Sequence, residues 1–148
     1  MEQDGATSSV FFTGNYDHTL DTKGRVSLPA KFRRSLPVEL KIVPKGNTVL
    51  IFTNEGLRSY IDTVVAQQMP QDMPGRTAAI SMAKFALTSS AEDTEIDSAG
   101  RISVSAKIRQ SVGLEKEVSI VGADDHIELM NRDVYAERMA AAQQFLLF

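Results

Sequence analysis

The chain has 148 residues, 43% hydrophobic and 24% charged, a balance typical of a soluble globular protein with one substantial core. It has no cysteine, which excludes disulfides and sulfur metal sites, and its longest apolar runs fall far short of the ~20 residues that a membrane helix needs. The net charge of -3 argues against a protein that coats nucleic acid, so any nucleic-acid site must be local.

The first predicted element is a β-hairpin that follows an N-terminal tail. MEQDGATSSV lacks the cationic and apolar regions of a secretory signal, so we expect residues 1–11 to be a flexible tail and the protein to be cytoplasmic. Residues 18–20 and 26–28 alternate as strands do. Between them, Asp21 can accept backbone hydrogen bonds and Gly24 can adopt positive φ, which predicts a hairpin loop.

A short helix, a second hairpin and two longer helices are predicted next. Pro29 suits the first turn of the short helix and Pro37 ends it. The segments ELKIVP and NTVLIFT alternate as paired strands joined by a turn. Asn54 is expected to cap a helix with apolar positions at helical spacing. After a Pro- and Gly-rich break at residues 69–75, a further helix is predicted over residues 77–87.

The chain contains an internal duplication. Residues 17–36 recur 76 positions later as residues 93–112, with nine identities in 20 positions. Asp97 and Gly100 repeat the turn pair, and the strands EVSIVG and HIELM repeat the second hairpin. In this copy Ser105 is expected to cap the short helix, Gly113 to end it, and Asn131 to cap a C-terminal helix.

Two copies of this length are more often one pseudo-twofold domain than a solenoid. We therefore expect an α+β, mainly β fold in which each half completes the other. The boundaries are predicted at residues 12–68 for the first half, 69–88 for a hinge and helix, and 89–148 for the second half.

Enzymatic motifs are not found. The only histidines are His18 and His126; His126 lies two positions from Glu128 and lacks a third metal ligand in sequence, so a surface or edge histidine is expected. The sequence contains no nucleophile elbow, P-loop or dinucleotide-binding motif. The paired aspartates 17/21 and 93/97 indicate turns, not a catalytic cleft. We expect no enzymatic activity and no cofactor.

The D-x-x-G-R element has a structural and a functional interpretation. Structurally, Asp21 and Gly24 make the turn and Arg25 forms a local ion pair with Asp21, as Arg101 does with Asp97. A surface ion pair contributes only ~0–1 kcal/mol, which leaves room for a second role. A tip that presents Lys23, the Gly24 backbone and Arg25 can enter a DNA groove, because Arg can contact guanine and Lys a phosphate.

The two copies differ in charge. Residues 17–36 carry a net charge of +3, whereas residues 93–112 carry a net charge of 0. Beyond its turn, the first copy carries the cations Lys31, Arg33 and Arg34. One interpretation is a local nucleic-acid contact on an otherwise acidic chain. The alternative is that they form a solvated helix face.

The duplicated segments DTKGR, followed by VSLPAKFR, and DSAGR resemble the MraZ family of bacterial transcriptional regulators. A single copy would resemble only the wider AbrB-like, swapped-hairpin superfamily. The resemblance implies a double-split β-barrel with attached helices, a ring-shaped homo-oligomer, commonly an octamer, and binding to short tandem repeats upstream of the division and cell-wall genes, the regulator's own gene included. It places DNA contact at Lys23, Gly24 and Arg25, with Arg101 at the matching position of the second copy and Ala99 where Lys23 would be.

The sequence thus predicts a nucleoid-associated repressor that binds double-stranded DNA as an oligomer and does not associate with a membrane. The expected DNA contacts are Lys23, Gly24, Arg25, Lys31, Arg33, Arg34 and Arg101, and the expected turn formers are Asp21, Asp97 and Gly100. A toxin-neutralising or scaffolding protein, which would use the barrel for protein contact alone, is the alternative.

Overall fold

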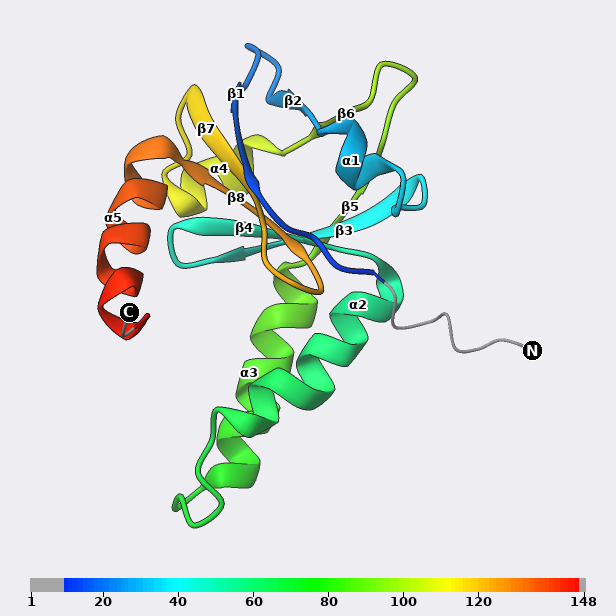
Figure 1. The fold of residues 1–148 in the computed structure, drawn as a ribbon. Coiled ribbons are helices and arrows are strands. Elements are labelled where there is room, and N and C mark those ends of the chain that lie inside the picture. The colour runs from blue at the N-terminus through cyan, green and yellow to red at the C-terminus, as the bar shows by residue number, and fades with distance from the viewer. Residues whose placement is uncertain (1–9, 147–148) are drawn as a thin grey trace, which may run out of the picture.

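The computed structural model describes residues 10–146. It contains eight strands, several helices and short π- and 3₁₀-helical segments (Figure 1). The elements of the first half are β1 (Asn15–Thr19), β2 (Arg25–Ser27), α1 (Ala30–Arg33), β3 (Glu39–Lys45), β4 (Thr48–Phe52), α2 (Asn54–Ser59) and the π-helix η2 (Tyr60–Val65). Then follow α3 (Arg76–Ser90), β5 (Glu92–Glu95), β6 (Arg101–Ser103), α4 (Ala106–Val112), β7 (Glu117–Gly122), β8 (Ile127–Asn131), α5 (Arg132–Ala142) and η3 (Gln143–Phe145).

The strands form two antiparallel sheets. One has six strands in the order β1-β7-β8-β4-β3-β5, and the other consists of β2 and β6. The prediction of an α+β, mainly β fold is therefore confirmed. Within residues 10–146 both sheets are open, and the double-split barrel stays a prediction.

The first predicted hairpin is wrong, because β1 and β2 do not pair with each other. The turn between them closes through two backbone hydrogen bonds, from Asp21 N to Arg25 O at 2.9 Å and from Gly24 N to Asp21 O at 3.0 Å. Beyond it the two strands diverge and find backbone partners in the other half. Leu20 N donates to Lys116 O at 2.8 Å and Leu28 N to Gly100 O at 2.9 Å.

The halves instead exchange strands. β1 of the first half pairs with β7 of the second, and β5 of the second half pairs with β3 of the first. The expected β3–β4 and β7–β8 hairpins are confirmed. Because each half supplies a strand to the sheet of the other, neither half has a complete sheet alone.

The β2–β6 pair places the two halves about a pseudo-twofold axis. Val26 lies opposite Ile102, its own equivalent in the repeat, and Arg25 lies opposite Ser103 while Ser27 lies opposite Arg101. Such a register is symmetric about the Val26–Ile102 pair. The internal duplication of the sequence is therefore a duplication of structure.

The main core lies where the two sheets and the short helices α1 and α4 meet. It contains Val26 and Ile102 from the small sheet, Phe32 from α1 and Ile108 from α4, all 1% exposed. The Phe32 ring packs edge-on against Phe12 and Tyr16, with centroid distances of 5.6 and 5.4 Å. The buried apolar residue of each short helix thus fills the space between the two sheets.

A second core joins the α2–η2 and α3 helices to β3 and β4. Val43 of β3 and Leu50 and Phe52 of β4 face this core, together with Leu57 of α2 and with Tyr60 and Ile61 of η2. These helices form a hairpin that projects away from the sheet (Figure 1). The predicted third helix is confirmed as α3, although none of its 15 residues is fully buried.

Two of the predicted caps form differently from expectation. Ser105 caps α4 by accepting a hydrogen bond from Ile108 N at 3.2 Å, and Gly113 ends it with φ of 71°, as predicted. Thr53 caps α2, not Asn54, because its hydroxyl accepts from Gly56 N at 2.9 Å. Asn131 precedes α5, but its side chain instead bonds the loop before β7.

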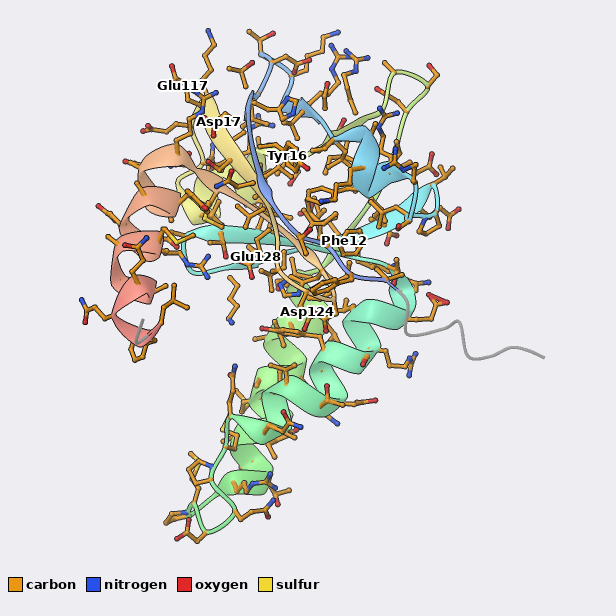
Figure 2. All side chains as sticks on the ribbon, in the orientation of Figure 1. Phe12, Tyr16, Asp17, Glu117, Asp124 and Glu128 are labelled. Atoms are coloured by element: carbon orange, nitrogen blue, oxygen red, sulfur yellow. The ribbon has the colours of Figure 1, made fainter. Side chains whose placement is uncertain are left out.

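Helix α5 is attached to the sheet mainly by its arginines. Arg132 donates to His18 O at 2.9 Å, Val118 O at 3.2 Å and Glu117 Oε1 at 3.2 Å. Six residues further along the helix, Arg138 donates to Glu128 Oε1 at 2.9 Å. Figure 2 shows Asp17 and Glu117 near the start of α5 and Glu128 further along it.

The N-terminal segment is joined to the β7–β8 turn. Phe12 and Asp124, labelled in Figure 2, exchange backbone hydrogen bonds of 2.7 and 3.1 Å. Of the predicted tail, residues 1–9 lie outside the described residues, and Phe11 is 68% exposed. Across residues 10–146, the structure has no helix with the length and apolarity required to cross a bilayer.

Candidate nucleic-acid interface

The first D-x-x-G-R turn is organised by Asp21. Its Oδ1 accepts hydrogen bonds from the backbone N–H groups of Lys23 and Arg25, both at 2.9 Å. Its Oδ2 accepts from Arg25 Nε at 2.7 Å. Gly24 has φ of 81° and donates to Asp21 O at 3.0 Å. One carboxylate therefore holds both the backbone of the turn and the arginine stem.

The second turn has the same geometry. Asp97 accepts from the N–H groups of Ala99 and Arg101 at 2.9 Å and from Arg101 Nε at 3.0 Å. Gly100 also has φ of 81°. The Arg25 and Arg101 side chains are 31% and 34% exposed, so both guanidinium groups reach solvent. The turns are thus structural equivalents.

The hydrogen bonds to these carboxylates favour their charged form. The backbone N–H of Arg25, assisted by its side chain and by Lys23 N–H, lowers the pKa of Asp21 to about 2 against the opposing effect of desolvation. The Arg101 backbone N–H does the same for Asp97, whose pKa is also lowered. Both turns keep their ionised aspartate, and hence their arginine anchor, throughout the neutral range.

Both turns lie at one end of the molecule. In Figure 1 the loop between β1 and β2 and the loop between β5 and β6 are at the top, and the α2–α3 hairpin projects from the opposite end. Strand pairing across the pseudo-twofold axis places them there together. A single surface therefore presents Arg25 and Arg101.

The other predicted DNA contacts have different environments. Lys23 and Arg34 are exposed, and their side chains have no hydrogen-bond or ion-pair partner within residues 10–146. Lys31 is exposed and donates to Thr13 Oγ1 at 3.0 Å. Arg33 donates from Nε to Leu28 O at 3.1 Å, and its guanidinium lies against Gly100 of the second turn.

The backbone of Gly24 is not open to a ligand. The residue is buried, its N–H is bonded to Asp21 O, and its carbonyl accepts from Val104 N at 2.8 Å. Arg109 covers the Cα, because a Cβ at this position would lie 1.6 Å from Arg109 Nη1. Gly24 consequently shapes the turn, and only the side chains beside it are open to a ligand.

His126 is buried and precedes the internal strand β8, contrary to the expectation of a surface or edge histidine. Its ring stacks on Phe52 with a centroid distance of 4.9 Å, and its two ring nitrogens lie 2.8 Å from Asp125 and 2.9 Å from Glu128. No pattern in the sequence indicated this, because the aromatic partner Phe52 comes from β4. Both nitrogens are engaged by carboxylates. The ring also meets the edge of Tyr60 in η2 with a centroid distance of 5.6 Å, so the residue ties β8 to the helical hairpin.

The fold and the site define a class: an internally duplicated, strand-exchanging α+β protein that presents two equivalent arginine turns at one end. The chain belongs to the MraZ family, whose model, described as "MraZ protein, putative antitoxin-like", matches residues 11–73 and 87–146.

Three relatives, each named transcriptional regulator MraZ, illustrate the similarity. The chain is 38% identical over 120 residues to the protein of Alkaliphilus oremlandii, covering 80% of this chain and 79% of the relative. It is 35% identical over 133 residues to that of Corynebacterium urealyticum, covering 88% and 87%. It is 33% identical over 128 residues to that of Mycoplasmoides gallisepticum, covering 85% of each.

Proposed function

We propose that the protein is a sequence-specific DNA-binding transcriptional repressor. The observation that carries the proposal is the pair of equivalent turns that present Arg25 and Arg101 at one end of the molecule. An arginine anchored by Nε keeps its two terminal nitrogens for a bidentate contact with guanine O6 and N7 in the major groove. The names of the relatives support regulation of transcription as the outcome.

In this proposal the first turn makes the stronger contact. Lys23 stands beside Arg25 and is exposed, whereas the equivalent position of the second turn is Ala99. Lys31 of α1 and Arg34, which follows α1 directly, are exposed; they contact phosphates and contribute affinity without sequence preference. Arg101 makes a weaker second contact.

We further propose that several copies assemble into a ring, an octamer, and bind short tandem repeats upstream of a division and cell-wall gene cluster that includes the protein's own gene. The apolar side chains Met82 and Phe85 of α3 are 66% and 65% exposed, which supports burial against a second copy. Several turns on one assembly raise the effective concentration and yield about 10²–10⁴ in avidity on spaced repeats. The protein would then be cytoplasmic and nucleoid-associated, with no catalytic activity.

Genomic footprinting tests this function. The expected result is a small set of protected sites made of short tandem repeats, one of them beside the protein's own gene. An assembled protein without any protected site would contradict the proposal. That outcome would favour a toxin-neutralising or scaffolding protein that uses the same fold for protein contact.

A further inference from the structure

Each D-x-x-G-R turn is covered by an arginine that belongs to the other half. Arg109 of α4 follows the second turn in the chain, yet its guanidinium packs on Gly24 of the first turn. Arg33, at the end of α1, follows the first turn and packs on Gly100 of the second, where a Cβ would lie 2.8 Å from Arg33 Cζ. Arg33 and Arg109 are equivalent positions of the repeat, so the contact is reciprocal.

A chain of hydrogen bonds accompanies each contact. Arg109 donates from Nη1 to Val104 O, and Val104 N in turn donates to Gly24 O at 2.8 Å. On the other side of the axis, Arg33 donates to Leu28 O at 3.1 Å, and Leu28 N donates to Gly100 O at 2.9 Å. Each arginine thus holds the residue whose N–H donates to the carbonyl of the turn glycine in the opposite half.

The glycines fit this arrangement for two reasons. Positive φ at Gly24 and Gly100 closes the turns, and the missing Cβ leaves space for the guanidinium. At Gly24 a Cβ would also lie 2.6 Å from Val104 O, so the turn is packed against backbone as well as against the arginine.

We propose that Arg109 and Arg33 are positioning residues for DNA recognition: Arg109 holds the turn that presents Lys23 and Arg25, and Arg33 holds the turn that presents Arg101. This inference rests on the proposed DNA-binding function, and it assigns to Arg33 a role other than direct contact with DNA. Each half thereby sets the orientation of the recognition arginine of the other half.

The first arm of the test needs no DNA. Hydrogen exchange is measured on the full-length protein for the amides of residues 23–25 and 99–101, in wild type, Arg109→Ala and Arg33→Ala. Loss of a contact worth about one hydrogen bond should speed local exchange about fivefold. Arg109→Ala should affect residues 23–25 alone, and Arg33→Ala residues 99–101 alone. Lys107→Ala, which removes an exposed cation from the same helix as Arg109, should change neither turn.

The second arm measures binding to an operator and to a scrambled duplex. Arg109→Ala should lower the ratio of the two affinities at least about fivefold, the lower end for loss of one bidentate base contact. If Arg109→Ala does not fold, Arg109→Met keeps the apolar stem and should give the same crossed pattern.

Three results would overturn the inference. They are faster exchange in the turn of the mutated residue's own half, equal acceleration in both turns, and a crossed exchange pattern with unchanged sequence discrimination. If wild type itself showed no discrimination between the duplexes, the proposed function would fail. The exchange pattern would then still decide whether the arginines hold the opposite turns.

Discussion

Val26 lies opposite Ile102 in the β2–β6 pair, and the two residues occupy the same position of the internal repeat. The turns that precede β2 and β6 are therefore related by the pseudo-twofold axis and share their hydrogen bonds. A difference in DNA contact between them must arise from the side chains that they carry. The clearest such difference is Lys23 against Ala99.

Ala99→Lys is expected to make the second turn a stronger DNA contact. Position 99 is exposed and its backbone is already held by Asp97, so a lysine fits without rearrangement. One added phosphate contact should steepen the slope of log K against log salt by about 0.9, and Lys23→Ala should reduce it by the same amount. Salt titrations of both variants measure this. Unchanged slopes would show that neither tip reaches a phosphate.

Thr53→Ala should destabilise the protein by about 1 kcal/mol, because the hydroxyl caps the first turn of α2. Asn54→Ala is the matched control, since Asn54 is exposed and lies within the helix. It should change the free energy of unfolding by less than about 0.5 kcal/mol. Urea denaturation compares the two variants, and a larger effect at Asn54 would contradict the assignment of the cap.

His126 should make stability depend on pH. Burial opposes its charged form, but the hydrogen bonds that its ring donates to Glu128 and Asp125 outweigh burial and raise its pKa above 6.5. Desolvation likewise opposes the charge on Glu128, but His126 and Arg138 lower the pKa of this carboxyl to about 2.

The linkage between proton binding and folding decides whether stability rises or falls with pH. A raised histidine pKa stabilises the folded state fully below about 6.5 and loses this effect as pH rises through the folded pKa. The lowered pKa of Glu128 stabilises the folded state above pH 4.5, and this stabilisation is lost as the pH falls toward 2. Wild type should thus lose more stability than His126→Gln between about pH 6 and pH 9, with Tyr60 and Lys45 as the other titratable groups nearby. Urea denaturation at each pH measures the free energy of unfolding. If the difference in this free energy between the two proteins stayed constant over this range, that would be inconsistent with a charged His126.

Met82→Glu combined with Phe85→Glu should disrupt assembly, because a charge on this face of α3 cannot be buried against another copy without a large desolvation cost. Light scattering should show a mass that falls toward the 16.2 kDa of one chain. Thr77→Glu, on an exposed position of the same helix, is the control and should leave the mass unchanged. An unchanged mass in the double variant would place the interface elsewhere.

Local signals in the sequence predicted local structure well. The β3–β4 and β7–β8 hairpins, the cap at Ser105 and the exit at Gly113 each depend on residues within a few positions of one another. The pairing of β1 with β7 does not, because alternation marks a strand without naming its partner. The expected β1–β2 hairpin failed for this reason.

The candidate site shows the same division. Asp21 and Gly24 can be assigned to a turn from their spacing, whereas the contacts of Arg33 and Arg109 depend on the exchange of elements between halves. The repeat did indicate that these two positions matter, since Arg33 and Arg109 form one of its nine identities. No sequence pattern indicated the burial of His126, because its neighbours Phe52 and Tyr60 are far away in sequence. Of the apolar C-terminal segment FLLF, Phe145 is 81% exposed, and residues 147–148 lie outside the described residues.

The most direct test of DNA recognition compares Arg25→Ala and Arg101→Ala with wild type on operator and scrambled duplexes across a salt titration. Arg25→Ala should cost ~1–3 kcal/mol of operator binding per engaged tip and relax sequence preference, with folding and assembly unchanged. Arg101→Ala should lose less, because its turn lacks the neighbouring lysine. Wild-type discrimination by Arg25→Ala would contradict base contact by the first turn, and an equal loss in Arg101→Ala would contradict the dominance of that turn.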